Sequence, residues 1–256
     1  MAQAQFFTRK MRLQNYADKL TRVVLSGNEL EDRELRGEAS ALWEMNPFEF
    51  CTQSEYESSK FNSDYYFLRF VDTATSDSLY ALRSLQLSKG GPADVQDIEA
   101  GFEIVRIPLG YVRDGEMQER SLCFLPAYID MIQAYVPDAA RSGRPPFTQI
   151  PHPRGKTFVF SERDLTAEAA EYEGFGSSDS NLLKMSDDDY LSVFKKGTEG
   201  AVVCIAIYPS AAIEGSDCYR LMAGADDHKL YYWEAFTLKE GTEVLFRLSD
   251  VVAAGR

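Results

Sequence analysis

Residues 201–208 read Ala-Val-Val-Cys-Ile-Ala-Ile-Tyr and are apolar throughout, with Gly200 before them and Pro209 after them. A continuous apolar run of this length, bounded by turn residues, is typical of a β-strand buried on both faces. Further strand-like stretches follow at 218–223, 229–238 and 243–248. Because short connections join antiparallel neighbours, the sequence predicts an antiparallel meander in the C-terminal part of the chain.

The charges that precede this run predict a helix that starts at Ser186. Serine is a favoured N-cap residue, and the three acids 187–189 would occupy the first turn. Lys195 and Lys196 would lie in the last turn, which is the charge order that the helix dipole favours. Further upstream, the sequence predicts a strand over 157–160 and a helix from Ser161 to about Tyr172.

The N-terminal half also mixes helix and strand patterns. Apolar residues recur at three- and four-residue steps over 6–25, which predicts a helix, and the aromatic run 65–70 predicts a strand. Asp114-Gly115 is typical of a type I′ turn, so 102–112 and 116–125 are expected to pair as an antiparallel hairpin. Pro126 then opens a predicted helix.

These patterns predict an α+β fold with mostly antiparallel sheets, a few packed helices and a C-terminal β-meander. Five prolines fall within 137–153, a density that favours extended loop or linker. The predicted organisation is an N-terminal α+β lobe at 1–140, a Pro-rich basic linker at 141–156 and a C-terminal α+β lobe at 157–256. No internal sequence repeat is visible.

Composition narrows the classes of function. The chain has 256 residues, 40 acidic against 27 basic, and a net charge of −13. The negative field of such a protein repels the phosphate backbone of nucleic acid, so no direct nucleic-acid binding is expected. The N-terminus lacks the apolar core of a signal peptide, and no apolar stretch is long enough for a transmembrane segment. The four cysteines show no Cys-x-x-Cys spacing, so we expect a reduced, soluble, cytoplasmic protein.

Catalytic motifs occur only as fragments. Gly155-Lys156-Thr157 lacks the earlier glycine and the following helix of a phosphate-binding loop. The sequence has two histidines, His152 and His228, and no His-x-x-x-His spacing, so no metal site and no cofactor is predicted. Cys204 lies in the most apolar run of the chain, where a thiol is usually inert. Whether the protein is an enzyme is left open at this stage.

Two features suggest contact with a protein partner. The first is the segment 137–156, which is basic although the chain as a whole is acidic. Arginine side chains in such a segment can bind carboxylates or phosphates through two hydrogen bonds at once. In the aromatic run 230–236, alternation would place Tyr231 and Trp233 on one face, where such rings are typical of interaction hot spots. The predicted partner-binding residues are Arg141, Arg144, His152, Arg154, Lys156, Tyr231 and Trp233.

The leading hypothesis is therefore a non-catalytic, acidic interaction or assembly subunit that binds a protein partner or forms a homo-oligomer. One alternative is a small-molecule hydrolase or transferase whose site is assembled from loops 137–156, 174–180 and 224–228, the last of which contains Asp226 and His228. A second alternative is an inhibitor that mimics nucleic acid, which requires carboxylates spaced like phosphates.

Overall fold

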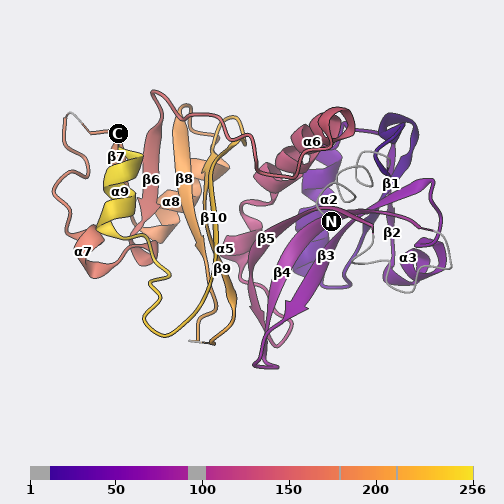
Figure 1. Ribbon diagram of the computed structural model, residues 1–256, viewed down its shortest axis with the longest axis horizontal. Coiled ribbons are helices and arrows are strands. Elements are labelled where there is room, and N and C mark those ends of the chain that lie inside the picture. The colour runs from indigo at the N-terminus through magenta and orange to yellow at the C-terminus, as the bar shows by residue number, and fades with distance from the viewer. Residues whose placement is uncertain (1–11, 92–101, 179, 212, 256) are drawn as a thin grey trace. The chain divides into compact units, whose positions relative to one another are not determined.

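A computed structural model describes residues 12–91, 102–178, 180–211 and 213–255. The chain forms two compact units, each built around its own five-stranded sheet (Figure 1). The N-terminal unit comprises Met1–Thr73, Arg83–Leu109 and Tyr128–Gln149, and the C-terminal unit comprises Ala74–Leu82, Gly110–Ala127 and Ile150–Arg256. The units therefore interleave in sequence.

The sheet of the N-terminal unit has the strand order β2-β1-β3-β4-β5, with β1 parallel to both β2 and β3. Its strands are β1 (Leu20–Val24), β2 (Phe48–Cys51), β3 (Tyr65–Ala74), β4 (Tyr80–Lys89) and β5 (Glu103–Arg113). The helices among the described residues of this part of the chain are η1 (Tyr16–Asp18), α2 (Glu29–Leu42), α3 (Gln53–Ser59), α5 (Glu119–Leu122) and α6 (Leu125–Ser142).

The sheet of the C-terminal unit has the order β10-β9-β8-β6-β7, with β6 parallel to β7 and β8, and with β8-β9-β10 antiparallel. Its strands are β6 (Thr157–Ser161), β7 (Leu182–Met185), β8 (Ala201–Ile207), β9 (Asp217–Gly224) and β10 (Leu230–Thr237). Its helices include η2 (Glu162–Asp164), α7 (Ala167–Ala170), α8 (Asp187–Lys195) and α9 (Leu248–Ala254).

The two sheets share one topology, which the sequence did not reveal. In each, the first strand lies between the second and the third and runs parallel to both, and two further strands extend the sheet beyond the third. A helix lies between the first and second strands in each unit and another between the second and third. The two units therefore have the same strand order and the same placement of helices between their first three strands.

One face of the C-terminal sheet carries the core of that unit. Side chains from β6, β8 and β9 pack there against Phe246 and against Val251 of α9, both fully buried. Helices α7 and α9 lie close together at this face (Figure 1). The strand residues of the cluster are Phe158, Phe160, Val202, Cys204, Ala206 and Met222. This face and α9 position the candidate site.

The structure confirms the α+β class and the C-terminal strand run. Strand β8 is buried at every residue, and α8 begins where Ser186 accepts a hydrogen bond from the backbone N–H of Asp189. The aromatic run at 65–70 lies in β3, and α6 contains Pro126 near its start. Both sheets are mixed, since parallel pairs join the predicted antiparallel ones.

Several predicted elements are wrong. The described part of 6–25 contains η1 and strand β1 in place of one helix, and residues 6–11 lie outside the described residues. Asp114 and Gly115 do adopt positive φ, but beyond the single bridge from Arg113 to Glu116 the chain enters α5, so no second hairpin strand forms. The segment before Gly143 is not extended, because α6 continues through Pro137 to Ser142.

Two further predictions, for segments near the C-terminal sheet, differ from the structure. The helix expected over 161–172 is reduced to η2 and the short α7, since Thr166, and not Ser161, accepts the capping hydrogen bond. The strand expected at 243–248 does not form: only Phe246 makes a bridge, to Leu165, and α9 begins at Leu248.

Candidate functional site

A cavity of about 290 Å³ opens between α9 and the C-terminal sheet. Apolar and aromatic side chains form most of its wall, and His152 stands at its edge as an exposed residue. Tyr232 also lines the cavity and leaves 38% of its surface exposed. The lining residues are His152, Pro153, Phe158, Arg220, Met222, Tyr231, Tyr232, Phe246, Asp250, Ala253 and Ala254. The volume fits a single large side chain or a small organic molecule.

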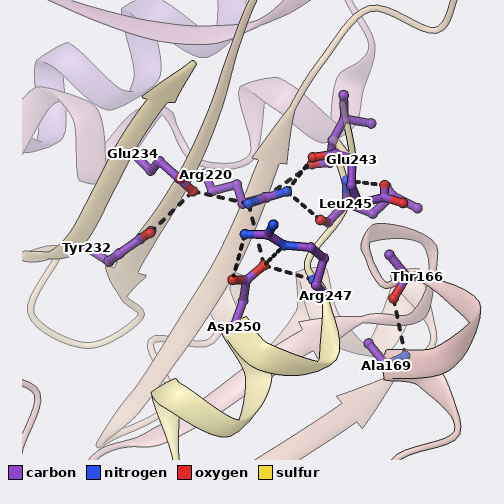
Figure 2. A network of polar contacts seen from close by, with 10 residues as sticks. Thr166, Ala169, Arg220, Tyr232, Glu234, Glu243, Leu245, Arg247 and Asp250 are labelled. Atoms are coloured by element: carbon purple, nitrogen blue, oxygen red, sulfur yellow. Dashed lines mark hydrogen bonds and ion pairs between the residues drawn. The ribbon is translucent and has the colours of Figure 1, made fainter. Parts of the chain in front are cut away.

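Arg220 connects the elements that form the cavity wall, namely strand β9, helix α9 and the segment before α9 (Figure 2). It projects from β9, is 3% exposed, and donates from Nη2 to the carbonyl oxygens of Glu243 and Leu245 at 2.5 and 2.7 Å. Its Nη1 lies 3.2 Å from a carboxylate oxygen of Glu234 and 3.4 Å from one of Asp250. One buried guanidinium thus fastens the segment before α9, and α9 itself, to the sheet. Because its donors are used internally, Arg220 shapes the cavity and offers little to a ligand.

An irregularity in β10 places two tyrosines at the same cavity. The pairing of β10 with β9 shifts between Leu230 and Tyr232, so Tyr231 is an extra residue in the ladder. Both Tyr231 and Tyr232 consequently line the cavity. The ring of Trp233 lies 5.5 Å from that of Tyr219, outside the cavity lining. The predicted alternation of Tyr231 with Trp233 is therefore wrong, since a bulge resets the two-residue period.

Lys156 lies beside Tyr231 in a compact ionic cluster. Its Nζ is 2.9 Å from Asp226 and 3.1 Å from Asp227, and it lies over the ring of Tyr231. Burial lowers the pKa of Lys156, but the hydrogen bonds from its ammonium to the two carboxylates outweigh burial and raise it overall. Tyr231 donates to Asp227 at 2.6 Å. Lys156 is therefore engaged within its own unit.

A second ionic cluster lies where β6 ends. Asp164, 1% exposed in its side chain, pairs with Arg120, whose Nε also lies 2.9 Å from Asp187. Burial raises the pKa of Asp164, and the neighbouring Arg120 opposes that rise without cancelling it. Ser161 donates its hydroxyl to Asp187 at 2.8 Å. These groups tie β6, α5 and the start of α8 together.

The other predicted contact residues are distributed over both units. Arg141 is exposed on α6 and pairs with Asp138 at 2.8 Å, while the carbonyl of Arg144 accepts from Tyr135. Arg154 is exposed. The structure thus brings His152, Lys156 and Tyr231 together in the C-terminal unit and places Arg141 and Arg144 in the N-terminal unit. Sequence reasoning missed Arg220 and Tyr232; an arginine inside an otherwise apolar strand was the available signal.

The reactive residue types are dispersed in the described part of the chain. All four cysteines are free thiols, and burial raises the pKa of Cys51 and Cys218 to about 11 and that of Cys204 well above its usual range. His228 stacks on Phe194, with ring centroids 5.6 Å apart. Within the described ranges, no three His, Cys, Asp or Glu side chains gather as metal ligands. Nor does any described helix have the length and apolarity needed to span a membrane.

Comparison with protein-family models, with curated proteins and with solved structures finds no match to this chain.

Proposed function

We propose that the protein is a non-catalytic interaction subunit that binds a basic protein partner, and that the cavity beside α9 receives an apolar side chain of that partner. The observation that carries the proposal is the position of Tyr232, which is 38% exposed and forms part of the wall of a largely apolar cavity. Partly exposed tyrosines around a preformed pocket are typical of interaction hot spots.

Charge supports the choice of a basic partner. The chain carries a net charge of −13, and an acidic field accelerates the encounter with basic proteins while it repels acidic ones. The four free thiols agree with a reducing compartment, so a cytoplasmic location is part of the same proposal.

The test is a selection of phage-displayed random peptides, about twelve residues long, on the immobilised full chain at low salt. We expect enriched peptides to combine basic residues with one aromatic or large aliphatic residue, and their affinity to fall as salt rises. Tyr232→Ala should weaken the enriched peptides about tenfold, because it removes a wall of the cavity.

Phe61→Ala is the matched control, because Phe61 is a similarly exposed aromatic residue (40%) far along the sequence from the cavity residues. It should leave peptide binding unchanged. Ala254→Leu, which extends a side chain into the cavity, should weaken binding as Tyr232→Ala does. Failure to enrich any peptide, or equal losses in Tyr232→Ala and Phe61→Ala, would contradict the proposal.

The hydrolase or transferase alternative has one observation in its favour: His152 and Asp250 line the same cavity. Asp250 is already paired with Arg220 and Arg247, at 3.4 and 3.3 Å, which leaves it poorly placed to orient an imidazole. A hydrolase would turn over an activated ester such as p-nitrophenyl acetate, and His152→Ala would abolish the turnover. We expect no turnover that depends on His152.

A further inference from the structure

Strand β10 is an open edge of the C-terminal sheet. It is the last strand in the sheet order, so in the described part of the chain one side of its backbone has no strand partner. It is eight residues long. The opposite edge, β7, has four residues, and the N–H of Gly176 donates to the carbonyl of Leu182 there at 2.9 Å. A long strand at the edge of a sheet is where an extended segment can add to it.

The hydrogen-bond pattern shows which groups of β10 point outward. The N–H of Leu238, which directly follows the strand, donates to the carbonyl of Ser216, directly before β9, at 2.8 Å. In an antiparallel pair the direction alternates from one residue to the next. Ala235 and Thr237, an odd number of residues from Leu238, therefore direct their N–H and C=O groups away from β9. Both are exposed.

The charge of the strand indicates which occupant fits. Glu234 is the one charged residue of β10, and its side chain is 36% exposed. Its carboxylate is paired with Arg220 at 3.2 Å, but a second copy of the chain at this edge would still bring a net charge of −13 against the −13 of the first. A segment with a basic residue opposite Glu234 replaces that repulsion with attraction.

We propose that the partner binds as an extended basic segment that adds to β10 as a sixth strand and directs an apolar side chain into the adjacent cavity. This inference rests on the proposed function and specifies its binding mode. In strand addition, main-chain hydrogen bonds supply affinity, and pockets for alternate side chains supply specificity. Tyr232 belongs to the edge strand and also lines the cavity, so the main-chain pairing and the side-chain pocket lie next to each other at this residue.

The test uses one enriched peptide from the selection above, synthesised with a single N-methyl group at each position in turn. N-methylation removes one backbone donor and leaves the side chain in place. Strand addition predicts that every second N-methyl group weakens binding, by about tenfold for each lost hydrogen bond, and that the intervening ones have little effect. The peptide should also slow amide exchange at Ala235 and Thr237.

A pair of protein variants provides an independent check. Ala235→Pro removes an outward N–H and spares the ladder to β9, so the peptide should lose about tenfold in affinity, whereas Ala235→Ser keeps the donor and should bind normally. If Ala235→Pro does not fold, the N-methyl scan alone decides. A peptide that binds through Tyr232 but shows no alternation would overturn strand addition and leave the proposed function intact. Absence of any enriched peptide would overturn both.

Discussion

The guanidinium of Arg220 donates to the backbone carbonyl of Leu245 at 2.7 Å, and this bond joins strand β9 to the segment that leads into α9. The segment 243–247 has little regular secondary structure of its own. The carbonyl groups of Glu243 and Leu245 accept from the Arg220 side chain, and only Phe246 bridges to a neighbouring backbone, at Leu165, so the strand-like sequence there does not form a strand.

Arg220→Met is accordingly expected to destabilise the C-terminal unit by about 3 kcal/mol, because it leaves Glu234, Asp250 and the bound carbonyls without their shared donor. The chain has two tryptophans, Trp43 in the N-terminal unit and Trp233 in the C-terminal unit. A Trp43→Phe background makes Trp233 fluorescence in urea a reporter of the C-terminal unit. Arg247→Met, at a residue 53% exposed, should cost less than about 1 kcal/mol. Equal losses in the two variants would refute the role given to Arg220.

The pairing of Arg120 with Asp164 leads to a second prediction. Arg120→Met leaves a carboxylate buried without its main cation, which should cost about 3–5 kcal/mol at neutral pH. Burial already raises the pKa of Asp164, so in the variant the folded state binds a proton more tightly than the unfolded chain does. The penalty should therefore shrink as the pH falls, since protonation removes the buried charge.

Urea unfolding of this variant at neutral and at acidic pH measures the effect. Arg163→Met is the control, because Arg163 is 47% exposed and lies 4.0 Å from Asp164. It should change stability little at either pH. A loss in Arg120→Met that does not depend on pH would exclude an ionised Asp164 as its cause.

The cysteines provide a third prediction. The pKa of Cys51 and Cys218 is about 11, and Cys204 is fully buried, so at neutral pH few thiolates exist at these positions. Iodoacetamide should label these three residues slowly in the native protein and rapidly after unfolding, as measured by mass spectrometry of peptides. Rapid native labelling of Cys204 would show that β8 is not in the core.

The sequence correctly predicted those elements for which several local signals agree. Helix α8 has an N-cap serine, an acidic first turn and a basic last turn, and β8 is apolar at every position. Strand β1 was missed because Leu20, Val23 and Val24 satisfy a helical spacing as well as a strand, and a short apolar run does not distinguish them. Its parallel pairing with β2 and β3 depends on residues distant in sequence.

The candidate site was harder to predict because it depends on long-range contacts. Lys156 directly precedes β6 and Asp226 follows β9, two strands that β8 separates in the sheet, and no local pattern records their approach. The shift at Tyr231 reverses which face the following residues occupy. Pro137 was expected to exclude helix, but the residues around it, Ile132, Val136 and Ala139, are fully buried, and their packing offsets the missing backbone donor.

The last prediction concerns the pH range over which Lys156 stabilises the C-terminal unit. The pKa of Asp226 and Asp227 is lowered: burial raises it, but hydrogen bonds, including those from Lys156, outweigh burial. Carboxylates with lowered pKa contribute stability above their unfolded pKa, near about 4, and lose it as the pH falls through the folded value. The raised pKa of Lys156 preserves its charge beyond about pH 10, so the contribution persists between these limits.

Lys156→Met should therefore lower the free energy of unfolding by about 1 kcal/mol near neutral pH and by almost nothing near about pH 2, where both carboxyls are protonated. The control is Lys239→Met at an exposed position, which should leave the pH profile unchanged. Urea unfolding followed by Trp233 fluorescence gives both curves. If the wild type and Lys156→Met differ by the same amount at both pH values, the stabilisation comes from the packing of the lysine stem against Tyr231, and the ionic account of this cluster is wrong.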